Sequence, residues 1–461
     1  MRIVNFVLIL ALLGIGSANA QDDKEMLKSI FDETLQHGEA YQKLDYLSNE
    51  IGGRLSGSPE AAAAVEWSKQ TMKAYGFDTV FLQEVMVPHW VRGKKEIVKV
   101  TGSDIFGPME LKTCALGNSV GTGDQGVLAS VVEVKDFDEL KKLGKSGVAG
   151  KIVFFSRPMD PTLISTFAAY GGAVDQRAKG ASEAAKLGAL AVVVRSMASN
   201  DDDIPHTGGL VYEKGVKQIP GVAISTNSAN YLSRALKGDA NTKLYIETHC
   251  EMLPEVLSYN VIGEMTGTSK PNEYIVVGGH LDSWDLGDGA HDDGAGCVQS
   301  IEVLRTLKAL NYKPKHSIRA VMYMNEENGL RGGLKYAELA KKNKEKHLAA
   351  IESDRGGFTP KGFTISGTKK AVSTLESWKE LFEPYGIYDF GKPGSGADIG
   401  PLEDQGTALI GFLPDSQRYF NYHHTDADTF DKIDKRELEM GAASMAALVY
   451  LIDQHGIDGA H

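Results

Sequence analysis

Cysteine is scarce in this chain, with 3 residues in 461. So small and odd a number excludes a fold held together by several disulfides, and no Cys-x-x-Cys pair suggests a zinc ribbon. At most one bridge can form. If one forms, Cys114 with Cys250 is the expected pair, because Cys297 falls on a predicted buried helix.

The chain also lacks an excess of positive charge. Its formal net charge is −12 at pH 7, which argues against nucleic acid or an anionic membrane as the main partner. No apolar run after residue 20 is long enough for a membrane span, so none is expected after removal of the N-terminal segment. The hydrophobic fraction of 42% is ordinary for a globular protein.

The first twenty residues have the composition of an export signal. Arg2 precedes an apolar run from Ile3 to Ile15, and the ending Ala18-Asn19-Ala20 fits cleavage by signal peptidase. We therefore predict a signal peptide at residues 1–20. The protein is expected to be exported, and either secreted or periplasmic.

Two kinds of sequence divide the rest of the chain. Residues 117–248 contain buried-strand patterns such as GKIVFF and an alanine-rich helix, with little acid or histidine chemistry. From residue 257 onward, strands and helices alternate strictly, which predicts a mixed or mostly parallel sheet covered by helices on both faces. We expect a three-layer α/β/α domain formed by residues 21–116 and 249–461, interrupted by a separate domain at 117–248.

Metal-ligand side chains follow the ends of the strands predicted in the C-terminal half: His280, Asp292, Glu326, Glu327, Asp354 and His424. In such folds ligands gather beyond the carboxyl ends of the strands, so we expect these side chains to meet. Imidazoles and carboxylates without thiolates favour catalytic zinc and also admit manganese or cobalt. Their number suffices for two ions that share one aspartate, and such a pair can activate water and polarise a carbonyl.

Two further roles follow from the chemistry of such a site. A histidine that binds metal needs its second ring nitrogen oriented, and Asp282, two residues after His280, can do this. Adjacent glutamates at a strand end point in different directions. One of Glu326 and Glu327 can therefore bind metal while the other takes a proton from water.

Five motifs in order, GGHLDSWD, HDDGAG, NEE, ESD and YHHTDADT, resemble those of the co-catalytic zinc exopeptidases, a family that includes bacterial leucine aminopeptidases and glutamate carboxypeptidase. The resemblance covers nearly the whole mature chain and is strongest to a dipeptide-cleaving carboxypeptidase of the family. It implies an exopeptidase with two zinc ions acting on dipeptides or short peptides, with an aminopeptidase as the alternative. It also implies a homodimer and a protease-associated domain at residues 117–248.

The resemblance implies a role for each residue. One zinc would be held by His280, Asp292 and Asp354, and the other by Asp292, Glu327 and His424. Glu326 would be the general base and acid, and Asp282 the partner of His280. His424 is chosen over His423 because the family ligand immediately precedes Ser or Thr. Residues expected near the substrate are Trp284, Asp398, Tyr422 and His423, and a cis peptide is expected at Asp292-Asp293.

Two other functions remain open on the same fold. A glutaminyl cyclase would bind a single zinc, and a binding protein would have lost its activity together with some of its ligands. The complete set of two-metal ligands in this sequence argues against both.

Overall fold

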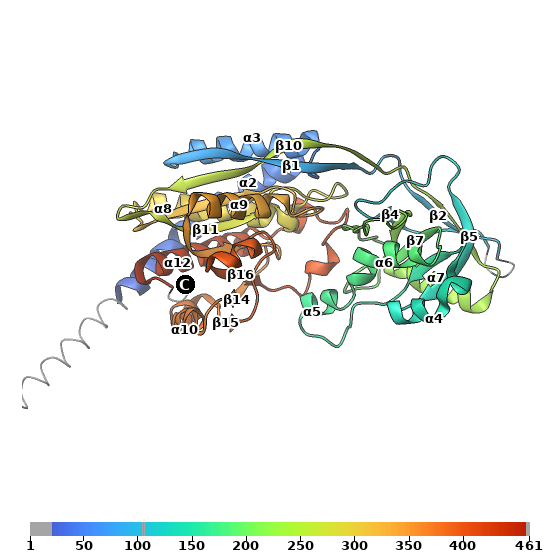
Figure 1. Cartoon of the computed structure of the whole chain (residues 1–461). Helices are drawn as coiled ribbons and strands as arrows, with labels where there is room; N and C mark the ends of the chain where they lie inside the picture. Colours follow the sequence, from blue (N-terminus) through green and yellow to red (C-terminus); the bar gives the residue numbers. More distant parts are fainter. Residues whose placement is uncertain (1–20, 104, 106, 458–461) are drawn as a thin grey trace, which may run out of the picture.

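Two lobes, each built on an eight-stranded sheet, make up the computed structural model, which describes residues 21–103, 105 and 107–457 (Figure 1). The signal peptide expected at residues 1–20 lies outside these residues. Within the described part of the chain, no helix combines the length and hydropathy that a membrane span requires.

The sheet of the first lobe is mixed. Its strand order is β1-β10-β12-β11-β13-β16-β14-β15. The four central strands β12, β11, β13 and β16 pair in parallel. Strand β10 is antiparallel to β1 and β12, and β14 is antiparallel to β16 but parallel to the edge strand β15. The strands are β1 Thr79–Val91, β10 Glu251–Met265, β11 Lys270–His280, β12 His316–Tyr323, β13 Lys346–Glu352, β14 Pro360–Ser366, β15 Asp389–Lys392 and β16 Ala408–Pro414.

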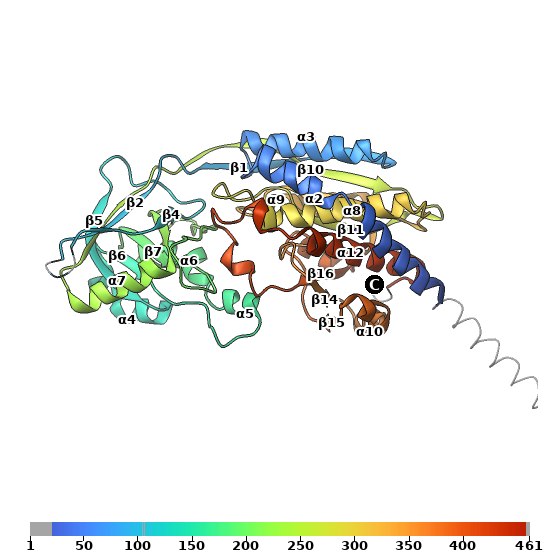
Figure 2. The same ribbon diagram turned by 180° about the vertical axis from the view of Figure 1, so that it is seen from behind.

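Helices cover both faces of this sheet, as the alternation of elements predicted (Figures 1 and 2). Alternate residues of a strand face opposite sides: Ile275 and Val277 of β11 join the core with α3, α8, α10 and α12, whereas Val276 joins the core with α9. The three-layer α/β/α prediction is thus confirmed. The elements are a helix at residues 21–37, α2 Ala40–Asp45, η1 Tyr46–Ile51, α3 Pro59–Ala74, η2 Ala290–Gly294, α8 Ala295–Ala309, α9 Arg331–Asn343, α10 Lys369–Ser377, α11 Lys379–Phe382, η3 Glu383–Tyr385, η4 Gly400–Gln405, η5 Tyr419–Asn421, η6 Phe430–Lys432 and α12 Lys435–His455.

The local sequence explains where these helices begin and how deeply they lie. The Ser58 hydroxyl accepts a hydrogen bond from the Ala61 amide at 3.0 Å, and Pro59 occupies the first turn of α3, where its missing N–H does no harm. Helix α12 is apolar around most of its circumference and is buried along nearly its whole length.

The second lobe has its own sheet, with strand order β3-β2-β9-β5-β6-β7-β8-β4. Its apolar cores lie on both faces, one with α4 and α6 and the other with α7. The elements are β2 Ile97–Thr101, β3 Met109–Glu110, β4 Thr113–Ala115, β5 Val127–Val134, α4 Phe137–Val148, β6 Ile152–Phe155, α5 Thr166–Gly171, α6 Asp175–Lys186, β7 Ala191–Arg195, β8 Gly221–Ile224, α7 Thr226–Gly238 and β9 Lys243–Glu247.

This second sheet begins before the boundary expected at residue 117. Strand β2 pairs with β9, and β4 pairs with β8, so residues 97–115 belong to the second lobe. The alternating pattern of such short strands indicates a sheet but not which sheet they join. The chain enters and leaves this lobe along the antiparallel pair of β1 and β10, which extends out of the first lobe (Figure 2).

The three cysteines are buried and free, so the expected Cys114–Cys250 bridge is not formed. Cys114 lies on β4 and packs into the core of the second lobe. Cys250 instead packs with Trp90 and Trp284 in a separate cluster. The two side chains therefore belong to different cores, which the sequence spacing does not reveal.

Candidate metal centre

Three neighbouring parallel strands end at the candidate site. His280 is the last residue of β11, Glu326 and Glu327 follow β12, and Asp354 follows β13. Because the carboxyl ends of parallel strands meet at one edge of a sheet, side chains distant in sequence become neighbours there. His424 approaches from the segment that follows β16 and η5.

Asp292 lies between two imidazoles at the centre of the cluster. Its Oδ1 is 3.3 Å from Nε2 of His280, and its Oδ2 is 3.3 Å from Nε2 of His424. Nε2 of His280 is also 3.5 Å from Oδ1 of Asp354. Nε2 of His424 is 3.1 Å from Oε2 of Glu327. The cluster therefore consists of two groups of ligand atoms that share Asp292.

Two oxygen atoms in the cluster show that the residues present fit a cation. Oε1 of Glu327 is buried and has no partner among the described residues, and Oδ2 of Asp292 is buried with only the ion-pair contacts to His423 and His424. A buried carboxylate oxygen without a partner is costly. Histidine nitrogens with carboxylate oxygens are ligands that zinc accepts, and zinc at these positions would satisfy both oxygens.

The electrostatics of the cluster favour positive charge among the acids. Burial raises the pKa of Asp292, but the bonds with His280 and His424 outweigh burial and hold it well below the usual range. Burial lowers the pKa of His424, yet Glu327 and Asp292 raise it to about 10. Burial raises the pKa of Glu327 to about 7. These directions are those expected of a site built to receive cations.

Asp282 contacts His280 through its backbone carbonyl, whereas the Asp282 carboxylate binds backbone amides of the segment after β12. Nδ1 of His280 donates to the Asp282 carbonyl oxygen at 2.8 Å, which leaves the Nε2 lone pair facing the cluster. The Asp282 carboxylate instead accepts the amides of Asn325, Glu326 and Glu327 at 2.6, 3.1 and 3.4 Å. Sequence spacing placed Asp282 beside His280, but spacing does not distinguish a carbonyl contact from a carboxylate contact.

The second lobe supports His424 directly. The Thr207 amide donates to the His424 carbonyl at 2.9 Å, and Nδ1 of His424 donates to the Thr207 carbonyl at 3.3 Å. His424 has a φ of 63°, a left-handed conformation uncommon for residues other than glycine. Nη1 of Arg177, on α6, lies 3.4 Å from the Thr207 carbonyl. No motif around Thr207 indicated this role.

His423 and Trp284, both expected near the substrate, border the cluster. The His423 ring stacks on His424 with centroids 3.5 Å apart, and its Nε2 is 3.7 Å from Oδ2 of Asp292. Both histidines thus reach Asp292, but His424 is nearer and also reaches Glu327. Trp284 lies edge-on to His424 at 5.8 Å, and it lines a small cavity at the cluster.

The other two residues expected near the substrate lie further back. Tyr422 stacks on His291 with centroids 5.4 Å apart. Asp398 is 1% exposed, and its carboxylate has no hydrogen-bond partner among the described residues. Burial, with Glu352 and Glu326 nearby, raises the pKa of Asp398 well above its usual range. Asp398 therefore belongs to the buried acids behind the cluster.

Two further aspartates, Asp293 and Asp428, hold the backbone of the cluster. The Asp428 carboxylate accepts the amides of His291 and Asp292 at 2.7 and 3.0 Å. The Asp293 carboxylate accepts the amides of His280 and Gly296 at 3.0 and 3.1 Å. The peptide bond between Asp292 and Asp293 is cis, as the resemblance implied. The acid-rich motifs contain these aspartates, but their spacing alone does not separate candidate metal ligands from aspartates that hold the backbone.

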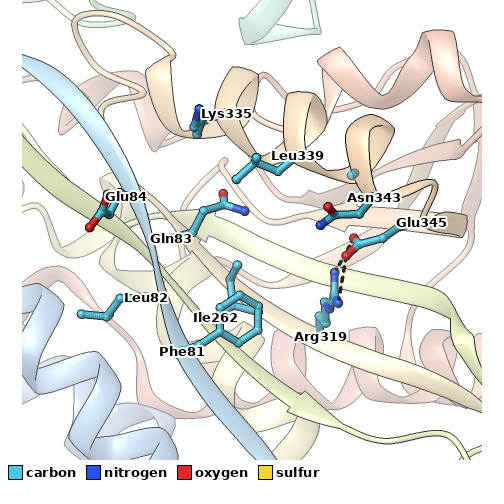
Figure 3. A pocket seen from close by; sticks show the side chains of 11 residues that line it. Phe81, Leu82, Gln83, Glu84, Ile262, Arg319, Lys335, Leu339, Asn343 and Glu345 are labelled. Carbon is cyan, nitrogen blue, oxygen red and sulfur yellow. Dashed lines mark hydrogen bonds and ion pairs between the residues drawn. The ribbon is translucent and has the colours of Figure 1, made fainter.

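A cleft of about 380 Å³ between β1, β10 and α9 contains none of these side chains (Figure 3). Arg319 in this cleft donates to Glu264 at 2.8 Å and to Glu345 at 2.7 Å. Its guanidinium also lies 3.7 Å from the centroid of the Tyr274 ring. Since its charge is already satisfied, this cleft offers less chemistry than the acid and imidazole cluster.

Comparisons with known proteins agree with the motifs. The pattern of Peptidase family M28 matches residues 260–449. Carboxypeptidase Q from Bos taurus is 35% identical over 93% of this chain and 89% of its own length, and that from Homo sapiens is 34% identical over 90% and 85%. The solved Peptidase M28 precursor from Shewanella amazonensis SB2B has a TM-score of 0.89 at 32% identity, covering 94% of this chain and 97% of that one.

A more distant structure shares the fold. BSAP, a zinc aminopeptidase from Bacillus subtilis, has a TM-score of 0.64 at 21% identity, covering 89% of this chain and 94% of that one. Together with the ligand cluster at the strand ends, the close relatives establish the identity that the motifs implied. The chain belongs to peptidase family M28 and is a zinc-dependent metallopeptidase.

Proposed function

We propose that this metallopeptidase is an exported exopeptidase with two zinc ions, which hydrolyses dipeptides or short peptides. The observation that supports the two-ion proposal best is the position of Asp292, with one oxygen 3.3 Å from each of two histidines. The similarity to carboxypeptidase Q over nearly the whole chain supports the choice of substrate.

The ligands divide into two sets in this proposal. His280, Asp292 and Asp354 would hold one zinc, and Asp292, Glu327 and His424 the other. When bound, the ions would polarise the scissile carbonyl and activate a water molecule for attack. Asp282 would keep Glu326 and Glu327 in place through the amides that its carboxylate accepts.

Glu326 would transfer a proton from the attacking water to the leaving amine. It is half-buried, and its backbone amide is held by Asp282 at 3.1 Å. Burial raises the pKa of Glu326 well above its usual range, and the neighbouring carboxylates of Asp354 and Glu327 raise it further. A carboxylate with a raised pKa is suited to accept a proton from water and pass it to the leaving amine.

The second lobe would act as a protease-associated domain that shapes access to the site. Its contacts with His424 and the position of α5 facing the first lobe support this proposal (Figure 1). The resemblance on which the domain name rests further implies a homodimer, which light scattering on the purified protein would test.

Aminopeptidase activity is the second candidate, because aminopeptidase YwaD of Bacillus subtilis is 24% identical over 89% of this chain and 84% of its own length. An assay on matched peptides separates the two activities. We expect a free dipeptide to be cleaved, cleavage to stop with a zinc chelator, and activity to return with added zinc. Faster cleavage of peptides with blocked C-termini would favour the aminopeptidase, and one zinc per chain would favour a glutaminyl cyclase.

A further inference from the structure

A small pocket of about 200 Å³ lies beside the cluster, next to Asp354. One of its walls, Phe167, belongs to α5 of the second lobe, so the pocket lies where the two lobes meet. A peptide bound at the cluster has room here for one neighbouring residue. The lining residues are Phe167, Glu352, Asp354, Arg355, Ser395, Gly396 and Ala397.

Both acids of this pocket already have partners. Asp354 is directed at the cluster, with Oδ1 3.5 Å from Nε2 of His280. The Glu352 carboxylate accepts the amides of Ala397 and Ile399 at 2.8 and 2.9 Å. These bonds hold the loop that forms the opposite wall. Neither acid forms an ion pair with Arg355, although both carboxylates lie near enough to favour its charge.

Arg355 is the unsatisfied charge among the residues that line this pocket. Its guanidinium lies 4.9 Å from the centroid of the Phe167 ring, and it makes no hydrogen bond or ion pair with any described residue. The side chain is half-buried. A partly desolvated guanidinium without an anionic partner is costly, and a ligand with a carboxylate would offset that cost.

Two other cations nearby differ from Arg355 in this respect. A larger cleft of about 750 Å³ also reaches Arg355, and Lys361 and Lys392 line it too. Lys361 pairs with Asp415 at 3.3 Å, and Lys392 pairs with Asp389 at 2.5 Å. Of these three cations, Arg355 alone forms no ion pair, and it directly follows the candidate metal ligand Asp354.

We propose that Arg355 binds the C-terminal carboxylate of the peptide substrate and makes the enzyme select a free C-terminus. The inference rests on the proposed function, because it assumes a peptide with its scissile carbonyl at the cluster. A guanidinium can form two parallel hydrogen bonds with a carboxylate, which sets orientation as well as affinity. The residue after the scissile bond would occupy the pocket, against the Phe167 ring.

The closed wall opposite Arg355 favours a substrate with a single residue after the scissile bond. A Cβ added to Gly396 would lie 2.2 Å from the Glu352 carboxyl carbon, so the loop packs tightly on Glu352. Selection of a free C-terminus together with a pocket for one residue describes an enzyme for dipeptides and for other peptides that lose one C-terminal residue.

The test compares the dipeptide Ala-Phe with its C-terminal amide. The variants are Arg355→Gln and Arg355→Lys, with Lys361→Gln as a control from the neighbouring cleft. We expect the wild-type enzyme to prefer the acid. Arg355→Gln should lower kcat/KM for the acid by about 10- to 100-fold, mainly through KM, and leave the amide nearly unchanged. Arg355→Lys should recover part of the loss, and Lys361→Gln should match the wild type.

A binding experiment gives a readout that does not depend on turnover. In the Glu326→Gln background, calorimetry should show tighter binding of Ala-Phe than of its amide, and Arg355→Gln should abolish the difference while the zinc content stays the same. Equal losses on acid and amide, or a lost zinc ion, would overturn the role of Arg355. Failure of the zinc-loaded wild type to cleave either peptide would overturn the proposed function itself.

Discussion

The two halves of the metal cluster rest on different parts of the molecule. His280 and Asp354 follow the central strands β11 and β13, and the His280 ring is held by a carbonyl of the same lobe. His424 lies on an irregular segment, and both its carbonyl and its ring contact Thr207 of the second lobe. The sheet positions one half of the cluster, whereas the other half depends on how the two lobes meet.

In the proposed metal site, this difference would give the second lobe a part in holding a ligand as well as in shaping access. A displacement of the second lobe would break the contacts between Thr207 and His424 and leave His280 undisturbed. Second-layer contacts of this kind typically change metal affinity by about 10- to 100-fold. The comparison can therefore be tested by substitutions that affect both halves of the metal cluster, neither half, or one half alone.

Replacing the shared ligand should have the largest effect, because it belongs to both halves. In Asp292→Ala each remaining set has two ligands. We expect the loss of both zinc ions and a fall in kcat/KM of more than about a thousandfold, beyond the range for supporting residues. Elemental analysis and a dipeptide assay check this. A variant that keeps one tightly bound zinc would show that Asp292 is not shared.

Replacing the proposed base should remove the chemistry and leave both halves intact. Glu326→Gln keeps the size of the side chain but cannot accept the proton. We expect kcat to fall by about 10²- to 10⁴-fold with two zinc ions still bound. Undiminished hydrolysis by this variant would refute the role of Glu326, and loss of zinc would make it a ligand instead.

A change in the second lobe should weaken one half alone. Arg177→Met removes the donor 3.4 Å from the Thr207 carbonyl, which in turn holds His424. We expect one of the two zinc ions to be lost to a chelator at about 10- to 100-fold lower concentration, and the other to be unaffected. Arg195→Met is the matched control, because Arg195 lies in the same lobe but donates to Asn230 at 2.7 Å. Equal weakening of both ions would contradict the comparison.

A buried acid in the first lobe should affect stability and neither half of the cluster. Burial raises the pKa of Glu302 on α8 to about 8, although Arg305 opposes the shift. The folded state therefore binds more protons than the unfolded state between the ordinary pKa of the group and about 8, and stability falls as pH rises through that window.

Glu302→Gln removes this titration. We expect the free energy of unfolding of the wild type to fall by about 3 kcal/mol more than that of the variant between pH 5 and pH 8, measured with urea. Peptidase activity at a single pH should match the wild type. A variant with the same pH dependence as the wild type would show that Glu302 is ionised in the folded protein.

The sequence predicted the half of the cluster built on the sheet better than the half built on contacts between lobes. Strand periodicity indicated His280 and Asp354, because ligands follow the carboxyl ends of parallel strands. The contact of Thr207 with His424 depends on the packing of two lobes, for which a sequence contains no periodic signal. The same limit applies to distant strand pairing, since β2 pairs with β9 and β4 with β8, each more than a hundred residues away.

The spacing of residues in the sequence also does not show which carboxylates of the site bind metal and which bind backbone amides. The motif HDDG contains a candidate ligand and its neighbour Asp293, which bonds to amides instead. Asp428, in the motif YHHTDADT, likewise accepts the amide of Asp292. An aspartate carboxylate can bind either a metal ion or a backbone amide. Which of the two it binds depends on where the fold places it.

Anomalous diffraction at the zinc edge, on crystals of the zinc-loaded enzyme, tests the central claim most directly. Our account predicts two zinc peaks on either side of the Asp292 carboxylate, one beside His280 and Asp354 and the other beside Glu327 and His424. A single peak, or a second ion that does not contact Asp292, would contradict it.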